Sequence, residues 1–159
     1  DLWDLKGTKQ IISKAETRNR SAAYPFEIPY RLINMYSLRE DTVLDPFLGT
    51  GTTTLAAIAC QRNSIGFEID PAFKNIIEEK ILDIDVDYLN TFTKNRIDLH
   101  RDFLFKRNAD TKKANIKHYN KNLDMQVMTS QETEIKFFNL IGIEVFGKSI
   151  TAKYENYKL

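Results

Sequence analysis

Residues 42–53 read Thr-Val-Leu-Asp-Pro-Phe-Leu-Gly-Thr-Gly-Thr-Thr, and this stretch decides the fold. Its apolar run ends at Pro46, which has no N–H to give to a strand ladder, so the run predicts a buried strand. Gly49 and Gly51 predict a turn, because glycine adopts left-handed backbone angles without strain. The Ala-rich run that follows, at 52–60, predicts a helix. The stretch therefore predicts a strand that passes through a glycine turn into a helix.

The neighbouring segments extend this pattern into a parallel βαβ unit. Upstream, apolar residues recur at helical spacing from Ile28 to Tyr36. Downstream, residues 64–69 predict a second strand. Asp70-Pro71 then predicts another helix, with aspartate as its cap and proline in its first position. Strand, helix and strand in this order imply parallel strands and a right-handed crossover. The sequence therefore predicts the α/β class, with a partial Rossmann-like core.

The C-terminal half has a different character and predicts an extension of that core. Its expected elements are a helix with a basic face at 86–107, a polar linker at 108–124, and a small antiparallel hairpin or sheet at 125–157 around Gly142 and Gly147. Residues 1–23 predict a loop. We therefore expect an incomplete core at 1–83 and a helical and antiparallel extension at 84–159.

Composition bounds the class of protein. The chain has 159 residues, of which 42% are hydrophobic, so it is long enough for one domain with a sizeable core. The single cysteine, Cys60, excludes an internal disulfide and a cysteine-based metal cluster, and we expect it to be a buried small apolar residue. No secretory signal or run of about 20 apolar residues is visible, which favours a reducing cytoplasm. Because Asp1 takes the place of an initiating Met, we expect an excerpted or processed chain.

The net charge of +1 hides an uneven distribution. Between Lys94 and Lys121 nine Lys and Arg residues face three acids. Basic segments of this kind attract polyanions such as nucleic acid, but the same charge also fits a solvated helix face. His100 and His118 are far apart and no third strong ligand follows them, so we expect no metal site.

An acid near the glycine turn points to a nucleoside ligand. Glu68 follows Gly49 by 19 residues, near the end of the predicted second strand, where an acid can accept hydrogen bonds from ribose hydroxyls. There is no Gly-Lys-Ser/Thr, which excludes a triphosphate P-loop. Thr54 stands where the dinucleotide fingerprint has its third glycine, which disfavours a pyrophosphate. A nucleoside without phosphates fits this pattern better.

Three segments in this order resemble motifs of the DNA amino-methyltransferases. Residues 44–53 are similar to the motif DPFxGSGTT, and residues 61–70, QRNSIGFEID, are similar to GRxxIGxEID. Upstream, residues 22–33, AAYPFEIPYRLI, resemble the segment HPAxFPxxLxxRLI, although Arg20-Ser21 replaces its His-Pro. Asp1-Leu2-Trp3 resembles the DxW of the same group. The resemblance covers about half of the chain.

This resemblance implies a Rossmann-like methyltransferase fold, S-adenosylmethionine as cofactor and DNA as partner. It also implies the β class, in which the catalytic segment and the target-recognition region precede the cofactor-binding segment. The family's catalytic signature is [DNS]-Pro-Pro-[Tyr/Phe/Trp], and the printed sequence has no Pro-Pro. We therefore expect the cofactor-binding part of a site-specific restriction–modification methyltransferase, with no catalytic residue and no methyl transfer by this chain alone. The catalytic motif is expected in an N-terminal half or a separate chain.

The resemblance also assigns the residues of the cofactor site. It implies that Asp45 and Phe47 lie beside the methionine moiety, that Gly49, Thr50, Gly51 and Thr52 form the floor and donate N–H groups, that Glu68 holds the ribose with Ile69 against the adenine, and that Tyr24 and Pro25 close the pocket. For Tyr24, an ordinary packed aromatic at a helix start is an equal alternative.

Two other functions fit parts of the pattern. One is an RNA methyltransferase that acts on a guanine amine, where DPFxGTGT strings also occur. Such enzymes carry their Pro-Pro motif downstream of the glycine turn, and nothing after Glu68 supplies it. The other is a decayed, non-catalytic methylase that retains only cofactor or DNA binding, which the absent Pro-Pro motif fits equally well.

Overall fold

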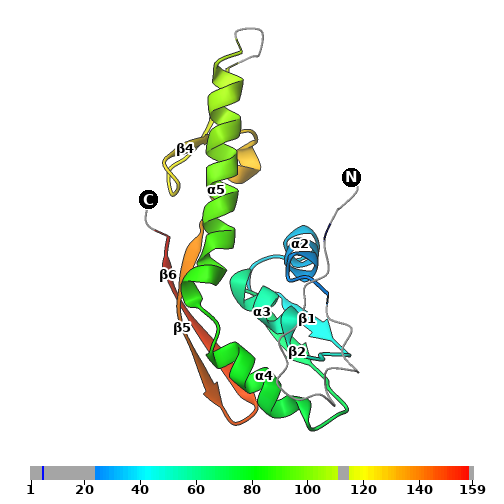
Figure 1. The fold of residues 1–159 in the computed structure, drawn as a ribbon. Coiled ribbons are helices and arrows are strands. Elements are labelled where there is room, and N and C mark those ends of the chain that lie inside the picture. The colour runs from blue at the N-terminus through cyan, green and yellow to red at the C-terminus, as the bar shows by residue number, and fades with distance from the viewer. Residues whose placement is uncertain (1–4, 6–23, 111–114, 158–159) are drawn as a thin grey trace. The chain divides into compact units, whose positions relative to one another are not determined.

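The computed structural model describes residue 5 and residues 24–110 and 115–157 (Figure 1). The predicted loop at 1–23 and the motif Asp1-Leu2-Trp3 lie outside these residues. The chain divides into two compact units, residues 1–84 with 143–151, and residues 85–142 with 152–159.

The first unit contains a parallel βαβ core. Its helices and strands are α2 (Glu27–Tyr36), β1 (Thr42–Asp45), α3 (Thr52–Ala59), β2 (Asn63–Gly66) and α4 (Phe73–Leu82). Strands β1 and β2 pair in parallel, with Thr42 opposite Asn63 and Asp45 opposite Gly66 (Figure 1). This pairing, with α3 as the connection, confirms the predicted strand–helix–strand order.

The small side chains of α3 place it in the core of this unit. Leu55, Ala56 and Ala57 are almost completely buried, and α3 packs against both α2 and β2. Cys60 directly follows α3 and is buried, as expected from the sequence. Asn34 of α2 donates a hydrogen bond to its sulfur at 3.0 Å. The Ala-rich sequence thus allows a close approach of two helices and a strand.

One face of the β1–β2 sheet is open in the described part of the chain, so the prediction of a buried β1 strand is wrong. Leu44 is 62% exposed, and its partner Ile65 is 52% exposed. Ser64 points to the opposite face, where its hydroxyl lies 3.5 Å from that of Thr54 on α3. Strand side chains alternate between faces, so α3 covers one face and the apolar side chains of the other remain exposed.

Two element boundaries also differ from the prediction. Strand β2 ends at Gly66 rather than at residue 69, although the Phe67 N–H still donates to the Asp45 carbonyl at 2.9 Å. Helix α4 begins at Phe73, because residues 70–74 first form a turn with Phe73 N–H bonded to the Asp70 carbonyl. The Asp70 carboxylate accepts from the Ala72 N–H at 2.9 Å, so this aspartate caps the turn before the helix.

The second unit is built on the long helix α5 (Val86–Asn108), which confirms the predicted helix at 86–107. The Asp85 side chain caps α5 by accepting from the Asp87 N–H. The other regular elements are β3 (His118–Asn120), β4 (Met125–Val127) and the short 3-10 helix η1 (Ser130–Glu132). Strands β3 and β4 are antiparallel. Ile97 and Leu104 of α5 pack with Leu123 and Met125 in one apolar cluster.

Strand β3 lies within the segment 108–124, so the prediction of a polar linker there is wrong for its last part. The reason is visible at Asn120, which is fully buried. Its side-chain amide donates to the carbonyls of Glu132 and Ile135, and its side-chain oxygen accepts from the Leu123 N–H. Buried polar groups need such partners, but the sequence alone does not distinguish Asn120 from the other polar residues of this segment.

Strands β5 (Phe138–Phe146) and β6 (Ser149–Asn156) form the predicted hairpin. Gly147 makes its turn with a left-handed φ of +61°, whereas Gly142 lies inside β5. Within the part of the chain that the structure describes, no helix has the length and apolar character that crossing a membrane requires.

A pair of alanine substitutions tests whether α4 packs on the glycine turn. A Cβ on Gly51, whose φ is +77°, would lie 3.3 Å from Ile77 Cγ2, whereas a Cβ on Gly147 would meet nothing within 4 Å. Gly147→Ala should cost about 1–2 kcal/mol, the usual penalty of a left-handed backbone. Gly51→Ala should cost more in urea unfolding, because α4 must also shift. Equal losses would contradict this packing.

Candidate cofactor site

The glycine turn joins the carboxyl end of β1 to the amino end of α3. Gly49 and Gly51 have φ angles of +54° and +77°, as the sequence predicts. The Leu48 N–H donates to the Phe67 carbonyl at 2.8 Å, which fixes the turn to the chain after β2. Helix α3 has no side-chain cap, so the N–H groups of its first turn, which lack acceptors within the helix, can serve a ligand.

The Glu68 carboxylate holds this turn in place. Its Oε2 accepts from the Gly49 N–H at 2.8 Å, and its Oε1 accepts from the Asp70 N–H at 2.9 Å. A carboxylate oxygen can accept more than one hydrogen bond. Glu68 can therefore hold the turn and still accept bonds from ligand hydroxyls.

Asp45 provides an acceptor that the described residues leave unused. Its Oδ1 accepts from the Phe47 N–H at 3.0 Å. Its Oδ2 is buried and forms no hydrogen bond of acceptable geometry in the described part of the chain, although the Tyr24 hydroxyl comes close to this carboxylate. A buried acceptor without a partner costs about 1–3 kcal/mol. This oxygen, at the end of β1, is therefore a place where a ligand donor would be favourable.

The structure brings Tyr24 to the same end of the sheet. Its hydroxyl lies 2.6 Å from the Thr53 hydroxyl in the first turn of α3. Burial raises the pKa of Tyr24, and the bond to Thr53 opposes this. The charge of Asp45 and the interaction of the Tyr24 hydroxyl with its carboxylate raise the pKa further. Pro25 follows with its carbonyl accepting from the Ile28 N–H at the start of α2.

The other assigned residues divide into two groups. Phe47 and Ile69 are 85% and 98% exposed, so their apolar surfaces are available to a ligand. The N–H groups of Gly49 and Gly51 already donate to Glu68 and to the Leu48 carbonyl. In the first turn of α3, the N–H groups from Thr52 onward lack acceptors within the helix and can donate to a ligand.

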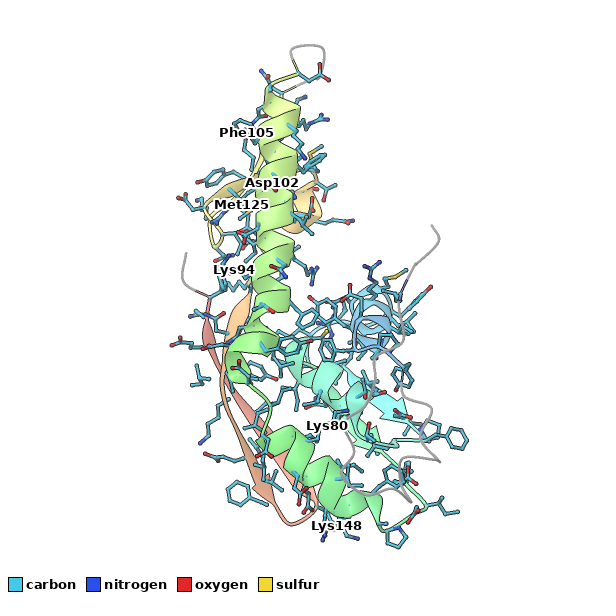
Figure 2. All side chains as sticks on the ribbon, in the orientation of Figure 1. Lys80, Lys94, Asp102, Phe105, Met125 and Lys148 are labelled. Atoms are coloured by element: carbon cyan, nitrogen blue, oxygen red, sulfur yellow. The ribbon has the colours of Figure 1, made fainter. Side chains whose placement is uncertain are left out.

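Lys80 is a residue of this region that sequence reasoning missed (Figure 2). Its Nζ donates to the hydroxyls of Thr50 and Thr52 at 3.1 and 3.0 Å. Burial lowers the pKa of Lys80. A signal was present in the sequence, because Lys80 follows Phe73 by seven residues and shares its helix face with Ile77 and Ile81, a spacing typical of core positions.

Comparisons with known proteins show what the sequence is similar to. Residues 1–79 match the family described as DNA methylase. A type II methyltransferase of Methanothermobacter thermautotrophicus, M.MthZI, is 45% identical over 139 residues, which are 87% of this chain and 37% of that protein. M.MjaI of Methanocaldococcus jannaschii is 53% identical over 97 residues, which are 56% of this chain and 31% of that protein. The chain spans about a third of the length of these relatives.

A solved structure gives a more limited likeness. A DNA modification methylase of Thermus thermophilus, also solved in complex with S-adenosyl-L-methionine, is 42% identical with a TM-score of 0.36. The match covers 38% of this chain and 26% of that one. The sequence matches alone show that the chain belongs to the DNA methylase family and is a part of a DNA amino-methyltransferase.

Replacing Glu68 by Gln tests whether its carboxylate holds the turn. The amide nitrogen of Gln cannot accept a hydrogen bond, so the N–H of either Gly49 or Asp70 loses its acceptor. We expect the free energy of unfolding to fall by about 1.5–3 kcal/mol, as for a hydrogen bond to a charged group. Glu79→Gln, at an exposed position of α4, is the control and should leave urea unfolding almost unchanged. Equal stability of the two variants would rule out this role for Glu68.

Proposed function

We propose that this chain is the S-adenosylmethionine-binding part of a site-specific DNA methyltransferase of the restriction–modification type, which methylates an exocyclic base amine. The unpaired, buried Oδ2 of Asp45 beside the glycine turn carries this proposal. The family description, DNA methylase, and the type II methyltransferases among the relatives favour DNA over the RNA alternative.

The chemistry of the site fits that cofactor. S-adenosylmethionine has an ammonium group, ribose hydroxyls and an adenine but no phosphate. Asp45 Oδ2 would accept from the ammonium, and Glu68 has lone pairs left for the ribose. Phe47 and Ile69 offer apolar surface to the rest of the molecule. The bound cofactor supplies the methyl group on its sulfonium, so the contribution of these residues is orientation.

The open face of the β1–β2 sheet supports the view that another segment completes the enzyme. Leu44, Ile65 and Phe67 expose more than half of their side chains. Parallel sheets are normally covered on both faces, and the relatives are about three times as long as the matched region. We propose that the remaining segment, fused or as a separate chain, carries the Pro-Pro signature and covers this face with apolar side chains.

Asp45→Asn separates cofactor binding from stability. The substitution replaces the carboxylate oxygen that has no hydrogen-bond partner. The free energy of unfolding of the variant should therefore stay within about 1 kcal/mol of the parent value or rise. Its affinity for S-adenosylmethionine should fall about tenfold or more, because a charge-assisted bond to the ammonium is lost. Calorimetric titration measures both proteins, with Asp83→Asn, an exposed position after α4, as the control. Parent-like affinity of Asp45→Asn would refute the proposed site.

We also propose that the basic residues between 94 and 121 contact DNA phosphates. Lys94 lies along α5 (Figure 2), where it pairs with Asp98 at 2.7 Å, so its charge is partly compensated. Lys106, Lys117 and Lys121 are exposed, and none of them takes part in an ion pair among the described residues. Lys112 and Lys113 lie outside the described residues. The three exposed lysines are therefore the cations best placed to meet a polyanion.

Neutralising these lysines together tests the contact. The triple variant Lys106→Gln, Lys117→Gln and Lys121→Gln should weaken DNA binding uniformly across sequences and reduce the slope of log K against log salt by roughly 0.9 for each phosphate that is no longer neutralised. Fluorescence anisotropy over a series of salt concentrations measures it. The control variant neutralises three exposed lysines elsewhere, Lys74, Lys136 and Lys148, with the same change in net charge. If both variants have the same slope, the segment is an ordinary solvated surface.

A further inference from the structure

Lys80 is a half-buried cation that contacts the glycine turn through hydroxyl groups. Its Nζ donates to Thr50 Oγ1 at 3.1 Å and to Thr52 Oγ1 at 3.0 Å. No ion pair among the described residues includes Lys80, and burial lowers its pKa. An ammonium has three donors and needs acceptors when it is removed from water. The two threonine hydroxyls therefore serve as its acceptors where an acid would be usual.

The contacts of Lys80 enclose the most constrained residue of the turn. Thr50 and Thr52 flank Gly51, which has a left-handed φ of +77°. Helix α4 also approaches Gly51 directly, because a Cβ there would lie 3.3 Å from Ile77 Cγ2. An apolar residue at position 80 would pack on the same helix face without the cost of desolvating a charge. What Lys80 adds, and an apolar residue could not, is a hydrogen bond on each side of Gly51.

We propose that Lys80 is a positioning residue for the cofactor site. By holding the hydroxyls of Thr50 and Thr52, it keeps the turn and the first N–H groups of α3 in the binding geometry before a ligand arrives. A preorganised site loses less entropy on binding, so Lys80 raises affinity through the turn. The ligand named in this inference rests on the proposed function, whereas the effect on the turn does not.

The test compares three variants of the full chain. Lys80→Met keeps an apolar stem of similar length but has no donor, and Lys80→Arg keeps a cationic group with several N–H donors. Lys74→Met is the matched control, because Lys74 is an exposed lysine of the same helix. Its Nζ lies 3.9 Å from Glu78 Oε1. We measure amide hydrogen exchange by NMR and affinity for S-adenosylmethionine by calorimetry. In Lys80→Met the amides of residues 49–53 should exchange about tenfold faster and the cofactor should bind about tenfold more weakly, as expected when bonds to a charged donor are removed. Lys80→Arg should restore most of the slow amide exchange and most of the affinity, and Lys74→Met should match the parent in both measurements.

Each other outcome has a definite meaning. Parent-like affinity in Lys80→Met, or parent-like exchange in its turn, overturns the proposal. Faster exchange throughout residues 24–84 also overturns it, because Lys80 would then be a general structural residue. If the parent itself does not bind S-adenosylmethionine, the proposed function fails, and the exchange data alone decide the role of Lys80. Faster exchange confined to the turn, with recovery in Lys80→Arg, would then still support it.

Discussion

The candidate site depends on one carboxylate, which connects the glycine turn after β1 to the chain segment after β2. Glu68 accepts the N–H of Gly49 from the turn after β1 and the N–H of Asp70 after β2. Because β1 and β2 are parallel, their carboxyl ends lie at the same edge of the sheet, and these bonds fix the backbone there. Lys80 acts on the other side of the turn through Thr50 and Thr52. The turn is thus held by a carboxylate that follows one strand and an ammonium on one helix.

The first unit has the properties of a part rather than of a finished enzyme. Its sheet exposes Leu44, Ile65 and Phe67 on one face. Asp45 retains a buried oxygen without a partner in the described residues. Both features cost free energy in the chain by itself, the first through apolar surface in water and the second through desolvation. Both would become favourable with a covering segment and a bound cofactor, which is consistent with a chain that spans about a third of its relatives.

The second unit shows how a polar segment can be ordered without a large apolar core. Its cluster joins Ile97 and Leu104 of α5 to Leu123 and Met125. The buried Asn120 then links this cluster to the following chain through hydrogen bonds to the carbonyls of residues 132 and 135. These bonds give acceptors to a side-chain amide that is fully buried. Few apolar residues therefore suffice to order the region between α5 and β5.

The sequence by itself determined the parallel βαβ core, because the local signals of residues 42–53 are strong and agree with one another. The resemblance added the expected cofactor and the expected site residues at the ends of the two strands. Tertiary structure alone decided which acceptors were already occupied: both oxygens of Glu68 are bonded, whereas Asp45 keeps one free among the described residues. It also decided that Lys80 reaches the turn and that β3 lies in a polar stretch. Local sequence cannot specify these features, because each depends on groups that are distant in sequence and meet only when the chain folds.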